Sequence, residues 1–185
     1  VGVIKNIQEF GISEHVINAY ETSKNMLSGL GHKLVEVDFS ELTSGICSYY
    51  VIAPAECSSN LSRFDGVKYG YRSKGAKDIA NLYMNTRSDG FGEEVKKRIL
   101  IGTHVLSAGF YDAYYLQAQK VRRMIKLKFE NFFKDVDLIF MPTTLDQAFE
   151  KNRKSDDPNR MYKEDLLTIP ANLAGLPAIS FPNGF

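Results

Sequence analysis

The chain has 185 residues, of which 44% are hydrophobic and 24% charged, and its formal net charge is +1. This length allows about one domain with a real core, and the composition is that of a globular protein, not a disordered one. A near-zero net charge argues against nucleic-acid binding by bulk electrostatics alone. The two cysteines, Cys47 and Cys57, exclude a disulfide framework and lack the spacing of a zinc site. No apolar run approaches the roughly 20 residues of a membrane span.

The first part of the chain predicts a strand–helix–strand unit. Residues 1–4 and 34–37 are typical of short strands, and apolar residues recur with helical period over 13–30. Ser13 is a suitable N-cap, and Gly31 suits the position just after the helix. Such a unit favours a parallel α/β sheet with a right-handed crossover.

The middle of the chain predicts helices separated by glycines. Residues 44–65 are rich in polar and aromatic side chains without a clean period, and 66–75 indicate a loop with several tyrosines. Helices are expected over 76–86, 92–106 and 111–134.

The last part predicts a buried strand at 136–141, a polar surface excursion at 145–164 and another strand at 178–182. The chain starts at Val1, and both of its ends are typical of strand interiors. We therefore expect a piece cut from a longer protein.

The common catalytic motifs are missing from this sequence. There is no G-x-S-x-G elbow, and the segment at 90–92 is a bare G-x-G that no Lys-Ser/Thr follows. His15, His32 and His104 have no metal-binding spacing, and we expect them to be solvated or structural. The motifs alone give no complete catalytic apparatus.

Arg98 is the most informative single residue. It shares one helical face with four small or apolar residues, which are Phe91, Val95, Gly102 and Val105. A guanidinium within an apolar stripe is unfavourable unless an anion meets it. The alternatives are a ligand carboxylate, a structural carboxylate, or a side chain that extends to water.

Asp165 and the pair Tyr49 and Tyr50 are the next candidates. Asp165 precedes an apolar, proline-bounded segment, where it could instead cap a helix that starts at Leu166. Tyrosines such as Tyr49 are most often core residues with a hydrogen-bonded hydroxyl. Together, a guanidinium for a carboxylate and an aspartate for an ammonium suit a free α-amino acid.

Four stretches of the chain carry a family resemblance. They are YYVIAPAECSSNLSRFDGV at 49–67, GFGEEVKKRI at 90–99, SAGFYDAYY at 107–115 and TIPANLAGLPA at 168–178. In this order they resemble the A subunit of the Glu-tRNA(Gln)/Asp-tRNA(Asn) amidotransferases, within the amidase signature family. The first and last stretches are partly shared with other amidase-signature enzymes, whereas the middle two are typical of the A subunits.

The resemblance implies an α/β fold, part of the amidase-signature fold, with a mixed sheet flanked by helices. It implies that residues 1–185 are a fragment of one amidase domain, without the N-terminal catalytic segment and the extreme C-terminus. A subunits of this family hydrolyse glutamine, and the ammonia that is released passes to a B subunit, where ATP and Mg activate the misacylated tRNA. A small C subunit holds A and B together in a heterotrimer that acts in protein biosynthesis.

The resemblance also assigns residues. Arg98 would bind the glutamine carboxylate, Asp165 its ammonium group, and Tyr49 would lie beside the substrate, with Tyr50 as the alternative register. The family's Ser–cis-Ser–Lys triad is expected upstream of residue 1, because the pair at 58–59 lacks surrounding glycines and a preceding lysine. The 185 residues alone are therefore expected to be inactive.

Further expectations concern the cofactors, partners and cellular location of the chain. No cofactor, metal or membrane is expected for it, and misacylated tRNA would bind mainly through the B subunit. A bacterial cytoplasm is expected, with an organelle as the alternative. Two other functions stay open at this point: a stand-alone amidase of the same family, and a non-catalytic binding domain. The choice between tRNA(Gln) and tRNA(Asn) would depend on the partner subunit.

Overall fold

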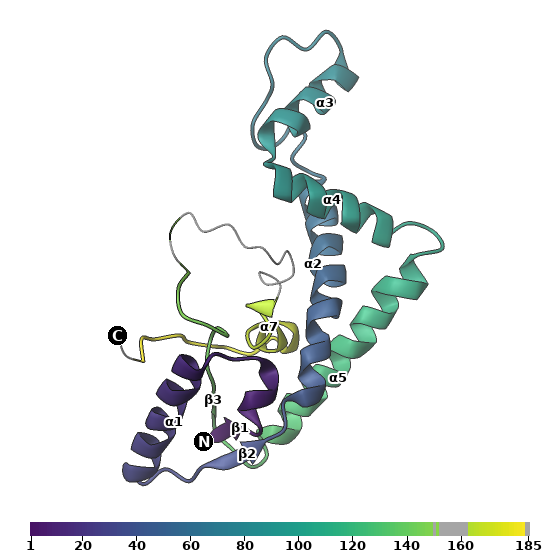
Figure 1. The fold of residues 1–185 in the computed structure, drawn as a ribbon. Coiled ribbons are helices and arrows are strands. Elements are labelled where there is room, and N and C mark those ends of the chain that lie inside the picture. Colours follow the sequence, from purple (N-terminus) through teal and green to yellow (C-terminus); the bar gives the residue numbers. More distant parts are fainter. Residues whose placement is uncertain (150, 152–162, 184–185) are drawn as a thin grey trace. The chain divides into compact units, whose positions relative to one another are not determined.

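A computed structural model describes residues 1–149, 151 and 163–183 (Figure 1). The chain divides into two compact units, the first made of residues 1–47 and 120–185 and the second of residues 48–119. The boundaries fall inside two helices, α2 (Gly45–Leu61) and α5 (Leu116–Phe132). No helix in the described ranges is both long and apolar enough to cross a membrane.

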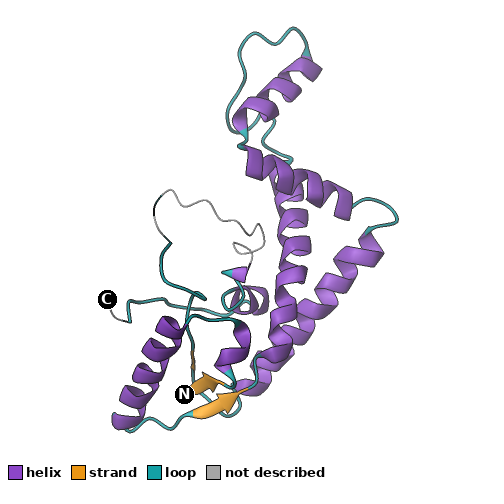
Figure 2. Cartoon of the chain, in the orientation of Figure 1, coloured by secondary structure: helices purple, strands orange, loops and turns teal. Residues whose placement is uncertain are grey.

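The first unit contains a small parallel sheet. Strand β1 (Gly2–Ile4) lies between β2 (Val35–Val37) and β3 (Ile139–Phe140), and both pairings are parallel. Helix α1 (Glu14–Gly29) connects β1 to β2 (Figure 2). The predicted strand–helix–strand unit and the α/β class are thus confirmed. A strand also precedes Pro142, but it is shorter than the expected 136–141 and half-buried instead of buried.

The ends of α1 also follow the sequence. Ser13 is the N-cap residue, although its hydroxyl makes no capping hydrogen bond. Gly31 follows the helix with a φ of 87°, in the left-handed region that favours glycine. A glycine at this position therefore ends α1 and turns the chain toward β2.

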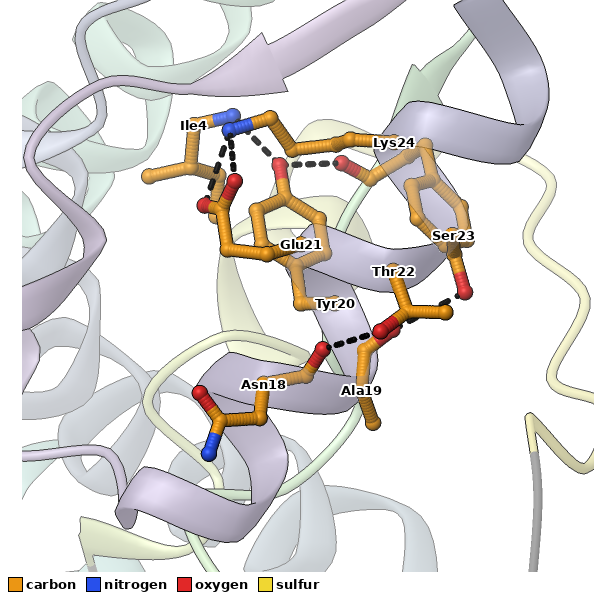
Figure 3. A network of polar contacts seen from close by, with 9 residues as sticks. Ile4, Asn18, Ala19, Tyr20, Glu21, Thr22, Ser23 and Lys24 are labelled. Carbon is orange, nitrogen blue, oxygen red and sulfur yellow. Dashed lines mark hydrogen bonds and ion pairs between the residues drawn. The ribbon is translucent and has the colours of Figure 1, made fainter. Parts of the chain in front are cut away.

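Tyr20 of α1 forms hydrogen bonds that connect the helix to strands β1 and β3 (Figure 3). Its hydroxyl accepts a hydrogen bond from the backbone N–H of Ile4 at 2.8 Å and donates one to the carbonyl oxygen of Phe140 at 3.1 Å. The rings of Tyr20 and Phe140 stack with centroids 5.4 Å apart. Tyr20 is only 1% exposed, so both hydrogen bonds are sheltered from water. Burial raises the pKa of Tyr20 to about 12.

Aromatic packing forms the rest of this unit's core. Phe39 meets the rings of Phe129 and Phe132 of α5, at centroid distances of 5.7 and 6.4 Å. On the same helix, the Arg122 guanidinium donates to the Leu173 carbonyl at 2.9 Å, near the end of α7 (Ile169–Ala174). Two 3₁₀ turns, η1 (Ile7–Phe10) and η2 (Ser40–Ser44), complete the connections.

The second unit is helical. It contains most of α2, then α3 (Ile79–Gly90), α4 (Glu93–Val105) and a π-helical turn, η3 (Tyr111–Tyr115), that leads into α5. The predicted helices at 92–106 and 111–134 are confirmed. The helix expected at 76–86 begins later, because the Asp78 carboxylate caps it by accepting from the Asn81 N–H at 2.8 Å, and it continues to Gly90.

One expectation was wrong. Residues 178–182 form no strand, and Ile179 and Phe181 are 86% and 62% exposed. Residues 44–65, for which the sequence predicted no element, contain the regular 17-residue helix α2, with Pro54 inside it. The polar segment expected at 145–164 falls largely outside the described residues.

Replacing Tyr20 by phenylalanine should destabilise the fold by about 1–3 kcal/mol, because the buried N–H of Ile4 and carbonyl of Phe140 lose their partner. Urea unfolding followed by circular dichroism measures this change. Tyr114→Phe, at a side chain that is 49% exposed, is the matched control and should change the free energy of unfolding little.

The same residue predicts a pH dependence. The folded pKa of Tyr20, about 12, lies above the ordinary value of 10, so the folded state holds the proton more tightly. Its contribution to stability should be complete below pH 10 and decline from there to about pH 12. The Tyr20→Phe variant should lack this part of the alkaline decline, and an identical pH profile for both proteins would contradict the assignment.

Candidate functional site

The candidate site lies where α4 packs closely against α2 within the second unit. Gly102 of α4 is buried, and a β-carbon added to it would overlap the carbonyl group of Pro54 and lie 2.7 Å from the Ser58 β-carbon. Only glycine leaves room for a backbone approach of this kind. Next to it, the Ser58 and Thr103 hydroxyls share a hydrogen bond at 2.9 Å. The helices are therefore fixed at their contact point.

Arg98 lies one turn before Gly102 on the same face of α4. This face behaves as predicted, since Gly102 and Val105 are buried and Val95 is half-buried. The Arg98 side chain is 35% exposed to solvent. The guanidinium is thus partly sheltered by the protein and still open to water, as a group that meets a soluble anion must be.

Two side chains hold Arg98. Its Nε donates to Glu94 Oε1 at 3.2 Å, one turn earlier on α4. Interaction with the Tyr49 hydroxyl of α2, and then the hydrogen bond with Glu94, raise the pKa of Arg98. The arginine is therefore fully charged at every physiological pH.

The Glu94 contact is one of the alternatives that the sequence left open, a pairing of Arg98 with a carboxylate of its own chain. Glu94 is 60% exposed, and exposed pairs at this spacing contribute only about 0.3–0.5 kcal/mol. Such a weak partner can be displaced by a ligand carboxylate. The pair shows that a carboxylate reaches this guanidinium.

Of the two adjacent tyrosines, Tyr49 is the one whose hydroxyl interacts with Arg98 and raises its pKa. The rings of Tyr49 and Tyr50 meet edge to face, with centroids 5.1 Å apart. Both are half-buried. The structure thus brings Tyr49 and Arg98 together.

Asp165, the third candidate, belongs to the other unit. Its side chain is exposed, and it does not cap a helix at Leu166, because α7 begins at Ile169 with Thr168 as the N-cap. Its carbonyl oxygen accepts from the Ile169 N–H at 3.0 Å. The carboxylate is consequently not used as a helix cap.

The other polar residues considered from the sequence take no part in this arrangement. His15, His32 and His104 are exposed, and the His104 ring packs on Phe110 with centroids 4.1 Å apart. Across the described residues there is no group of three or more histidine, cysteine or acidic side chains that could hold a metal ion. Cys47 and Cys57 are free thiols.

A hollow of about 190 Å³ lies further along α2 and was not expected from the sequence. Its lining comes from α2, the end of α4 and η3: Ala55, Glu56, Ser59, Leu106, Tyr111 and Tyr115. The Tyr111 and Tyr115 rings stack at 5.1 Å. Its polar lining residues are Glu56, Ser59 and the two tyrosines.

In chemical terms, Arg98 gives the second unit a group that can bind an anion. A guanidinium offers planar, paired donors that match a carboxylate, and the Tyr49 contact restricts how the Arg98 side chain can turn. An activated nucleophile is a separate requirement, which the Ser58–Thr103 pair does not meet. The Thr103 hydroxyl donates to the Ile99 carbonyl and accepts from Ser58, so neither hydroxyl is paired with a base.

The comparisons with known proteins are consistent over the whole chain. The family model described as "Amidase" matches residues 1–185. The A subunit of the glutamyl-tRNA(Gln) amidotransferase of Thermosynechococcus vestitus is 49% identical over all 185 residues, and that of Thiobacillus denitrificans is 54% identical over 175 residues, 95% of the chain. The chain spans 38% and 36% of the lengths of these two relatives.

A solved structure agrees with these relatives. The crystal structure of the A subunit of the glutamyl-tRNA(Gln) amidotransferase from Thermotoga maritima aligns with 98% of this chain, at 35% identity and a TM-score of 0.61. The alignment covers 36% of that protein.

Replacing Gly102 by alanine should destabilise the second unit by about 1–3 kcal/mol or more, because the new methyl group meets the rigid Pro54 carbonyl. Separation of α4 from α2 would also break the bond between Arg98 and Tyr49. Gly29→Ala is the matched control, since nothing lies within 4 Å of that position and its φ is ordinary. Thermal unfolding should show a clear loss for the first variant and none for the second.

Proposed function

The chain belongs to the amidase family, and on this basis we propose that it is the substrate-recognition part of a glutamine-hydrolysing A subunit of an aminoacyl-tRNA amidotransferase. In the proposed reaction, glutamine is hydrolysed to glutamate and ammonia. The ammonia then converts Glu-tRNA(Gln), or Asp-tRNA(Asn), into the correctly amidated aminoacyl-tRNA. The relatives' names support the first of these tRNAs.

The observation that carries the proposal is the pairing of Arg98 with Tyr49. The half-exposed guanidinium would bind the α-carboxylate of glutamine, displacing Glu94, while Tyr49 keeps the arginine in position. Asp165, with its exposed carboxylate, would accept from the α-ammonium group. These three residues would orient the substrate by its two charged groups and leave its side-chain amide for the nucleophile.

The chemical step needs residues beyond this anion site. We propose that a Ser–cis-Ser–Lys triad in the same subunit, outside these 185 residues, attacks the amide. The 185 residues alone would then bind substrate groups without releasing ammonia. We further propose a heterotrimer with B and C subunits in the cytoplasm, in which ATP, Mg and most of the tRNA surface belong to the B subunit.

Arg98→Ala in the complete amidotransferase should raise the KM for glutamine by about 10- to 100-fold, since a charge-assisted contact of about 1.5–3 kcal/mol is lost. Amidation driven by ammonium salts should continue, because free ammonia bypasses the glutamine site. Both rates are measured by formation of amidated aminoacyl-tRNA.

Lys97→Ala is the control for the preceding variant, because Lys97 is an exposed cation next to Arg98 on α4. It should leave both reactions unchanged. Equal loss of the glutamine-driven and ammonium-driven reactions in Arg98→Ala would show that Arg98 has a structural role instead.

Tyr49→Phe tests the positioning of the arginine. It removes the hydroxyl that bonds to Arg98 and keeps the ring, so we expect a KM for glutamine several-fold higher and a folded protein. Tyr50→Phe, which keeps the Tyr49 bond, should have a smaller effect on this KM. The reverse order of the two variants would favour Tyr50 as the residue beside the substrate.

A further inference from the structure

One loop of the second unit is strongly basic. Residues 66–77, here called the tyrosine–lysine loop, contain four basic residues and no acidic one, a net charge of +4. Since the whole chain carries +1, the other 173 residues carry −3. The near-neutral total therefore conceals a strongly basic segment.

Three of the four cations of the tyrosine–lysine loop are available to a ligand. Lys68, Lys74 and Lys77 are exposed, and within the described part of the chain none of them forms an ion pair. Arg72 instead forms a hydrogen bond within the loop, because its guanidinium donates to the Gly66 carbonyl oxygen at 3.0 Å. The nearby carboxylate of Asp65 accepts from backbone N–H groups, which lowers its pKa.

The loop is held in place by buried polar contacts. The N–H of Ser73 donates to the Thr86 hydroxyl of α3 at 3.1 Å, and both residues are buried. Gly66, with a φ of 78°, lies against the same threonine, where a β-carbon would come within 2.8 Å. The loop is therefore fixed beside α3 (Figure 1), with the lysines held on a defined backbone.

Two aromatic rings are presented on this backbone. Tyr69 and Tyr71 are 54% and 55% exposed, although tyrosine rings usually bury most of their surface. The Tyr69 ring packs against the Phe64 ring, with centroids 6.2 Å apart, and the Tyr71 ring lies against Gly90 of α3. Each ring is thus supported on one side and open on another.

We propose that the tyrosine–lysine loop binds RNA, with Lys68, Lys74 and Lys77 on phosphates and the Tyr69 ring stacked on an unpaired base. Exposed aromatic rings between cations are how proteins bind single-stranded RNA, because every base has a stacking face and every nucleotide a negative charge. In the reaction proposed above the RNA is the tRNA, and this identification rests on that proposed function.

A protein partner is the competing occupant, since Val67 of the loop is also half exposed at 50%. The charge favours RNA. Interfaces between proteins are depleted of lysine relative to the rest of the surface, whereas this loop has three lysines in ten residues, 68–77.

The test uses the complete amidotransferase and purified tRNA in a binding titration across a range of salt concentrations. The triple variant Lys68→Gln, Lys74→Gln, Lys77→Gln should bind tRNA about tenfold or more weakly. Its slope of log affinity against log salt should be smaller by about 2, as expected for three lost phosphate contacts to a single strand. Tyr69→Ala should weaken binding about 5- to 100-fold with an unchanged slope.

The matched control neutralises Lys5, Lys33 and Lys134, three exposed lysines of the other unit, and should change neither affinity nor slope. Glutamine hydrolysis by the loop variants should equal that of the wild type. Unchanged tRNA affinity, or the same loss in the control, would overturn the proposal. So would failure of the loop variants to assemble with their partner subunits, which would assign the loop to a protein interface. Failure of the proposed function would appear separately, as a wild-type enzyme that does not hydrolyse glutamine.

Discussion

The close approach of α4 to α2 is the contact on which the candidate site depends. A glycine at position 102 lets the backbones of the two helices meet at Pro54. One turn before this contact, Arg98 reaches the Tyr49 hydroxyl across the same helix pair. Neighbouring side chains hold Arg98, and its guanidinium is partly exposed to water. The position of this side chain therefore depends on how the two helix backbones pack, and not on long-range charge interactions. A larger residue at 102 would therefore alter recognition without touching a charged group.

The sequence was most informative where periodicity is strong. The helical spacing along α4 was enough to predict that Arg98 and Gly102 share a face, and the strand–helix–strand pattern predicted the parallel pairing of β1 and β2. Helix α2 could not be predicted in this way. Its apolar residues lie in one run around Ile52, with no polar face to mark a period, and Pro54 normally ends a helix.

Other parts of the site needed three-dimensional information. The bond between Tyr49 and Arg98 joins residues 49 positions apart, and no spacing rule reports such a contact. The sequence also suggested a helix cap at Asp165, and the structure places the start of α7 later, at Ile169. The resemblance to amidotransferase A subunits supplied the roles of these residues, and the family match over residues 1–185 supports that source.

Binding of the glutamine α-carboxylate by Arg98 can be seen in a crystal structure of the complete amidotransferase with a non-hydrolysable glutamine analogue. We expect guanidinium nitrogens of Arg98 within about 3 Å of the ligand carboxylate, the Tyr49 hydroxyl still beside Arg98, and the Asp165 carboxylate at the ligand ammonium group. An analogue whose carboxylate is bound by other residues, with Arg98 still paired to Glu94, would contradict it.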